Sequence, residues 1–227
     1  MNVRMSLALL SSAALSATVL CGAQLDAYRN FRLGMTVADA AKQTGLAATD
    51  VRLASTRPER IEELDWHVNW TPRSAAQSLP FSELLLRFYN GKLFEMAVSY
   101  NRDQTRGLTE NDMIDAISAV YGPASLPPAA EVTFPSGLTG SVLPVIARWG
   151  DSVSQLNLVH LLYGPGFGLV ISTQADKILA EQAMAESDRL KEAEAPQREI
   201  DLRARQVAET LAADEKARAL NKAGFRP

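Results

Sequence analysis

Two histidines, His67 and His160, are the only imidazoles in the sequence. A metal site built along one element needs two such ligands at a spacing such as HxH or HxxxH, which brings both rings to one side. Each histidine here stands alone in a stretch where apolar and polar residues alternate. We therefore expect His67 to be a solvated strand residue and His160 to be a polar position within a strand. We expect neither to bind a metal or a cofactor.

An acidic cluster at Glu62, Glu63 and Asp65 contains the residue type that general acid–base catalysis uses in pairs. Large apolar residues alternate with polar ones along this stretch, which is typical of a half-buried strand. The alternation places Glu63 and Asp65 on the side opposite Leu64 and Trp66, with no apolar pocket evident around them. We interpret the cluster as a solvated strand face rather than a catalytic pair.

No other stretch carries a recognisable catalytic or phosphate-binding motif. A G-x-S-x-G elbow is absent, and the glycines of GPGFG at 164–168 precede a strand-like run instead of a helix, which predicts a turn. The net charge of −3 and the lack of a basic patch interleaved with aromatic residues exclude a nucleic-acid partner. The sequence therefore predicts a protein that is not an enzyme.

Two similar helix motifs organise the chain. Thr36 begins the first as a helix cap, and Gly45 ends it; Thr109 begins the second, and Gly122 ends it. In each motif an aspartate follows the threonine by three residues, as in a capping box. We predict one helix after Thr36 and a longer helix after Thr109.

Alternating runs after each helix predict strands. The first unit contains a strand at 61–70 and a hairpin at 79–101 around Asn90-Gly91, a dipeptide that favours a tight turn. The second unit contains strands at 143–150, 154–163 and 167–174. We expect one face of the hairpin to hold these residues: Leu84, Leu86, Phe88, Phe94, Met96, Val98 and Tyr100. The predicted class is α+β at 28–174, with two tandem helix-plus-three-strand units forming one antiparallel sheet and helices on one face.

These motifs resemble the fold shared by BamE (SmpA/OmlA) envelope proteins and the β-lactamase inhibitor protein. Gly34, Met35, Thr36 and Gly45 match the helix motif, and the run Phe88-x-Asn90-Gly91-Lys92-Leu93 matches the hairpin. The resemblance covers about residues 31–173 and implies a duplicated α+β unit behind a signal peptide. Unlike the outer-membrane-assembly proteins, this chain has no good lipobox and adds a long C-terminal segment.

The N-terminus has the pattern of a secretory signal. Arg4 precedes an apolar stretch from Leu7 to Leu20, and a cleavage site at Ala23 would make residues 1–23 a signal peptide. The stretch is shorter than the ~20 residues that span a bilayer, so we expect no transmembrane span in the mature chain. Cleavage at Ala23 predicts a periplasmic or secreted protein without a thiol; acylation at Cys21, giving a lipoprotein, is the alternative.

The C-terminal segment, 175–227, is rich in Ala, Glu, Lys and Arg and predicts a charged helical extension broken near Pro196. Ile200, Val207 and Leu211 lie on one side of this helix, at coiled-coil-like spacing that ends within three heptads. One interpretation is a docking arm or a self-associating helix. The other is a pair of solvated helices.

The sheet face opposite the helices is the second candidate for binding. Its expected outward residues mix polar, aromatic and aliphatic groups, a composition found at protein interfaces; they are His67, Asn69, Leu85, Arg87, Tyr89 and Leu93. The C-terminal helix folding back over this face is the alternative. We expect a non-catalytic exported envelope protein that binds another envelope protein or serves in assembly. An inhibitor that clasps an enzyme through this face and a hydrolase with an unrecognised site are the alternatives.

Overall fold

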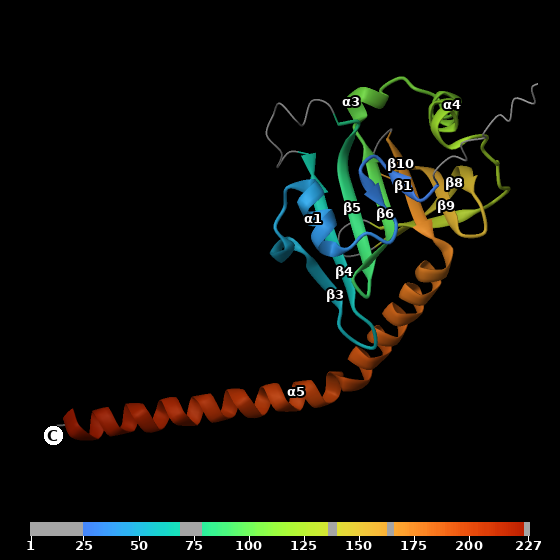
Figure 1. Ribbon diagram of the computed structural model, residues 1–227. Helices are drawn as coiled ribbons and strands as arrows, with labels where there is room; N and C mark the ends of the chain where they lie inside the picture. The colour runs from blue at the N-terminus through green and yellow to red at the C-terminus, as the bar shows by residue number, and fades with distance from the viewer. Residues whose placement is uncertain (1–24, 69–78, 136–139, 163–165, 225–227) are drawn as a thin grey trace, which may run out of the picture.

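An antiparallel sheet of eight strands forms the centre of the protein (Figure 1). The computed structural model describes residues 25–68, 79–135, 140–162 and 166–224, so the predicted signal peptide lies outside the described residues. The strand order is β3-β4-β5-β6-β10-β9-β8-β7. The strands are β3 (Arg52–Ser55), β4 (Ile61–His67), β5 (Phe81–Tyr89), β6 (Lys92–Tyr100), β7 (Glu131–Phe134), β8 (Ser141–Gly150), β9 (Ser154–His160) and β10 (Phe167–Thr173).

Shorter elements surround this sheet. A two-stranded ribbon joins β1 (Ala27–Tyr28) to β2 (Phe31–Arg32). The helices are α1 (Val37–Thr44), α3 (Arg102–Thr105), α4 (Glu110–Tyr121) and α5 (Gln174–Gly224), and a 3₁₀ turn, η1, spans Ala48–Asp50. The class is therefore mixed α and β, with an antiparallel sheet and a long C-terminal helix.

The sheet contains two strands that the sequence did not predict. β3 and β7 have four residues each and form the two edges. Each offers only four residues of pattern, and β7 lies in a connection that contains several prolines and glycines between α4 and β8. Each half of the sheet is consequently a meander of four strands, and the last strand of one, β6, pairs with the last strand of the other, β10.

Both predicted helix motifs are confirmed. The Thr36 hydroxyl accepts the backbone N–H of Asp39, and Gly45 ends α1 with φ of 73°, a left-handed conformation that favours glycine. Thr109 and Asp112 form a reciprocal capping box at the start of α4. These local bonds satisfy helix N–H groups that would otherwise have no partner.

A bulge in β6 changes which side chains share a face. Arg87 pairs with Glu95, but the next residue of β5, Phe88, pairs with Leu93, so Phe94 is the extra residue. The expected grouping of Phe94 with Met96 was therefore wrong. Phe94 lies on one face with Ile61, while Leu93 is buried on the other.

The two faces of the sheet are covered by different elements. The front face packs its apolar side chains against α1 and α4, through residues such as Ala40, Ala41 and Ile117. The back face is covered on one side by the start of α5, where Ala180 and Ala183 contact Ile61 and Phe94. On the other side, β7 and the first half of β8 fold over it. The two domain helices, α1 and α4, thus share one face, and the start of α5 covers part of the other face, which was the alternative named for it.

The C-terminal helix is continuous where the sequence predicted a break. α5 has 51 residues and contains Pro196. A proline removes one helix hydrogen bond and kinks the helix without necessarily ending it, and α5 changes direction as it leaves the domain (Figure 1). The Arg198 guanidinium donates to the Lys191 carbonyl across this region.

Removing the cap of α4 should lower the stability of the domain. Thr109→Ala deletes the hydroxyl that accepts the Asp112 N–H at 3.2 Å, and caps of this type contribute about 1 kcal/mol. Urea unfolding should show this loss. Thr210→Ala is the control, because the Thr210 hydroxyl only donates to its own helix. Equal stability of T109A and wild type would contradict the capping role.

The same cap predicts a pH dependence. The Thr109 N–H donates to the Asp112 carboxylate at 2.7 Å and holds the pKa of Asp112 below its ordinary value. A lowered folded pKa stabilises the protein above the unfolded pKa, and this contribution is lost as the pH falls through the folded value. Unfolding measured across acidic pH should show wild type more stable than Asp112→Asn near neutrality, with the difference vanishing in acid. A constant difference would contradict the assignment.

Candidate functional site

The residues expected on an open sheet face lie in three different environments. Leu93 is fully buried on the front face because the β6 bulge reverses its side. Leu85 is on the back face but is buried under β7 and β8. Tyr89 is half-buried beside α5, and Asn69 lies outside the described residues. The expectation that Leu85 and Leu93 point outward was therefore wrong. Leu85 is covered by β7 and β8, and the bulge in β6 turns Leu93 to the front face.

Arg87, also expected to face solvent, is the centre of a row of charges across the back face. Arg52, Glu63, Arg87 and Glu95 are consecutive cross-strand neighbours on β3, β4, β5 and β6. Their charges alternate in sign, and Lys177 of α5 adds a fifth. We call these five residues the ion row. Cross-strand pairs of opposite charge stabilise a sheet, so the row favours this register.

The contacts of the ion row converge on Glu95. The Arg87 guanidinium donates to one Glu95 oxygen at 2.6 Å, and the Lys177 ammonium lies 3.0 Å from the other. Arg87 also lies 3.3 Å from Glu63, which pairs with Arg52. The Glu95 side chain is only 1% exposed. Because a buried carboxylate without partners is strongly unfavourable, Glu95 requires both cations to stay in place.

Sequence reasoning missed Glu95 and Lys177. A signal for Glu95 existed, since it is the only charged residue in the run LFEMAV, and a charge inside an apolar strand is rarely buried without a partner. Lys177 had no comparable signal, because a lysine in a charged helix is ordinary. Its role depends on where α5 crosses the sheet.

The second predicted region, the C-terminal helix, divides into a root and an arm. The root packs on the domain, where the Ser55 hydroxyl donates to that of Ser187 at 3.1 Å and Arg57 pairs with Glu194 at 3.0 Å. The arm is the part of α5 from residue 195 to 224, and every side chain from 195 to 222 is exposed. A helix of this length extends about 45 Å, and it projects from the domain (Figure 1).

The arm presents the apolar residues that the sequence singled out. Ile200, Val207 and Leu211 are each 60% exposed. Together with Ala204 they form a stripe on one side of the helix, at positions i, i+4, i+7 and i+11. We call these four residues the apolar stripe. Isolated exposed leucines are normal on protein surfaces, but a stripe on a projecting helix is the arrangement used in helix-mediated recognition.

A groove of about 390 Å³ lies on another part of the surface, between the β1 region, α3 and α4. Its lining is mainly apolar and includes the exposed Val120. Burial raises the pKa of Tyr28, Tyr100 and Tyr121, so these hydroxyls stay protonated at neutral pH. The Tyr121 hydroxyl donates to the Ala27 carbonyl at 2.9 Å. The tyrosines therefore support the packing of the N-terminal ribbon.

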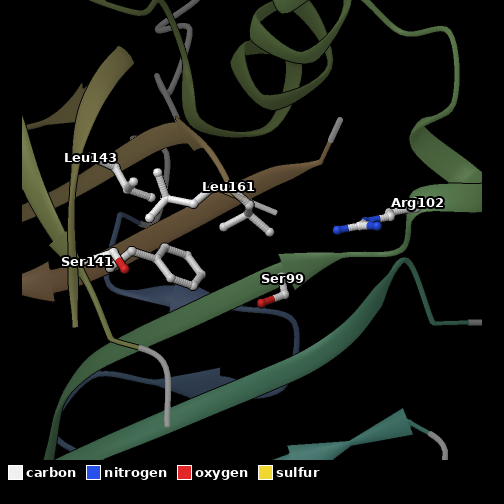
Figure 2. A pocket seen from close by; sticks show the side chains of 7 residues that line it. Ser99, Arg102, Ser141, Leu143 and Leu161 are labelled. Atoms are coloured by element: carbon white, nitrogen blue, oxygen red, sulfur yellow. The ribbon is translucent and has the colours of Figure 1, made fainter. Parts of the chain in front are cut away.

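A smaller pocket of about 140 Å³ lies where β7 and β8 fold over the back face. Figure 2 shows Leu143 and Leu161 close together, with Ser99 and Arg102 on the far side of Leu161. Apart from the Arg102 guanidinium and two serine hydroxyls, the lining is apolar. Its volume is below the roughly 300 Å³ of typical ligand pockets, so it does not indicate a site for a drug-sized ligand.

Each histidine has a carboxylate partner. The His160 ring lies 2.8 Å from Glu110 of α4 and 4.8 Å, between centroids, from the Phe167 ring. His67 lies 3.0 Å from Asp65 on its own strand. Both histidines are the partly exposed strand residues that the sequence predicted, at the ends of β4 and β9. The His67 contact lies within one strand, whereas the His160 contact depends on α4 packing beside β9.

No protein-family model matches the sequence, and no curated protein or solved structure matches it significantly. Within the described residues, no helix combines the length and apolar composition needed to cross a bilayer. Function must therefore be inferred from the residues and contacts of the chain itself.

Breaking the ion row should destabilise the domain. Arg87→Met removes the guanidinium that neutralises Glu95 and Glu63, and loss of one partner of a buried pair costs about 3 to 5 kcal/mol. Urea unfolding should show a loss of about 3 kcal/mol. Adding Glu95→Gln to this variant should recover part of it, because the buried charge is then absent.

The matched control is Arg106→Met. Arg106 pairs with Asp103 at 2.9 Å, but these side chains are 81% and 83% exposed, and exposed pairs contribute at most about 1 kcal/mol. If Arg87→Met lost no more stability than Arg106→Met, the buried ion row would not have the structural role assigned to it.

Proposed function

We propose that the protein is a non-catalytic, exported protein of the bacterial envelope that binds another envelope protein through its C-terminal helix. The observation that carries this proposal is the arm. Three large apolar side chains, Ile200, Val207 and Leu211, remain 60% exposed on a helix that projects from a well-packed domain. A rigid root with an accessible apolar stripe suits a docking element, since little ordering entropy is lost when the partner binds.

The partner we propose is a different protein rather than a second copy. The apolar stripe ends where Asp214 and Arg218 occupy the next positions of the spacing. Fewer than three heptads make a homotypic coiled coil marginal. A groove on another protein can accept a short amphipathic helix through three or four anchors.

The back face is less suited to the alternative inhibitor role. Leu85 is buried, and the Arg87 guanidinium is paired with Glu95 and Glu63. Neither Leu85 nor Arg87 is therefore available to contact another protein. Clasping an enzyme through these residues would require α5 to leave the sheet and expose Glu95. The arm needs no such rearrangement to bind.

We further infer a duplicated unit, as in the BamE and β-lactamase-inhibitor-protein fold that the sequence resembles. Helix α1 precedes the meander β3 to β6, and α4 precedes the meander β7 to β10. The strand order of the two halves is mirrored about the central β6–β10 pair. This order supports a repeat of one helix and four strands, and export is supported by the signal-like residues 1–23.

Site-specific photo-crosslinking tests the docking proposal. A crosslinking amino acid at Val207, within the apolar stripe, should give a discrete adduct with a second envelope protein in the bacterium that makes this chain. The matched control is the same amino acid at Glu209, which is two residues away and on the opposite side of the helix. Leu211→Glu in the Val207 background should reduce the adduct at least about ten-fold, because a charge at the stripe opposes apolar burial.

Three results would contradict the proposal. Equal adducts at 207 and 209 would show contact without a preferred side, and no adduct at either position would show an unoccupied arm. An adduct containing only two copies of this chain would show that the arm self-associates instead of binding a different protein.

A further inference from the structure

Three side chains of metal-ligating type meet on the back face, next to the end of β4. Asp65 and His67 are two residues apart on β4 and therefore point to the same side. Glu83 of β5 is the cross-strand neighbour of His67. One ligand atom from each residue lies within 4.8 Å of the other two. The sheet register thus assembles one imidazole and two carboxylates.

The charges of this cluster are not balanced by neighbouring cations. In the ranges the structure describes, neither Asp65 nor Glu83 forms an ion pair with a lysine or arginine. Arg87, the arginine of β5 on this face, is held by Glu63 and Glu95. Asp65 Oδ1 is also buried, and it has no hydrogen-bond partner among the described residues. A buried carboxylate oxygen without a partner is unfavourable, and a bound cation would satisfy it.

We propose that Asp65, His67 and Glu83 bind a divalent first-row metal ion, with Zn²⁺ as the best-suited probe. Mixed imidazole and carboxylate ligands favour such ions over Mg²⁺ or Ca²⁺, which prefer oxygen alone. Zinc bonds of about 2.0 to 2.2 Å place tetrahedral ligand atoms roughly 3.3 Å apart. The three ligand atoms, which lie within 4.8 Å of one another, have to move closer to reach that spacing. Water completes the coordination, and the ion joins β4 to β5.

Isothermal titration calorimetry with Zn²⁺ on the full chain tests this site. Every protein carries Cys21→Ser, because Cys21 is the only thiol in the sequence and thiolates bind zinc strongly. The expected result is saturable binding of one ion per chain. Glu83→Gln and His67→Ala should each weaken binding at least about ten-fold, since loss even of a residue that only orients a ligand costs 10- to 100-fold.

The matched control is His160→Ala. His160 also has a carboxylate partner, with Glu110 at 2.8 Å, but the metal-ligand group found among the described residues does not include it. His160→Ala should leave the zinc affinity unchanged. Thermal unfolding with and without zinc gives a second readout, because a ligand that binds only the folded chain raises the midpoint. Wild type should show the rise, and Glu83→Gln should not.

Three results would overturn the proposed metal site. Unchanged affinity in both Glu83→Gln and His67→Ala would overturn the proposal, as would loss of binding in His160→Ala. So would a wild-type chain that gives neither saturable heat nor a thermal shift. Far-ultraviolet circular dichroism establishes that each variant is folded before it is titrated.

Discussion

The carboxylate of Glu95, buried in the centre of the sheet, is the constraint on which the arrangement of the back face depends. A buried charge is tolerated only with close opposite charges, and Glu95 has two, from β5 and from the first turns of α5. Its strand, β6, pairs with β10, and α5 begins at the residue that follows β10. The chain therefore delivers Lys177 to Glu95 with no intervening loop.

This contact explains why the C-terminal helix has two parts with different properties. Near the sheet, Ala180 and Ala183 let α5 approach Ile61 and Phe94 closely. Farther along, the helix has passed the edge of the domain, and its side chains are exposed. The part of the back face under α5 thus becomes part of the interior, and the arm is accessible to solvent. The same sheet register that aligns the ion row also brings Glu83 beside His67.

Local signals in the sequence predicted local features well. Thr109 and Gly122 delimit α4, and Asn90-Gly91 forms the turn between β5 and β6, because caps and tight turns depend on a few adjacent residues. The bulge at Phe94 was not predictable from alternation, since one extra residue reverses the face of Leu93. The stripe containing Val207 was found because helical spacing alone defines it. The neighbours of His67 depend on pairing between strands, which no single stretch reveals.

The central claim is that α5 is anchored at its root by buried contacts and free along its arm. Native-state hydrogen exchange measured residue by residue along α5 tests it most directly, because protection reports the local free energy of opening. The account predicts that amides near Ala180 and Ala183 exchange as slowly as those of β6, whereas amides beyond Pro196 exchange much faster. Fast exchange at the root, or equal protection along the whole helix, would contradict it.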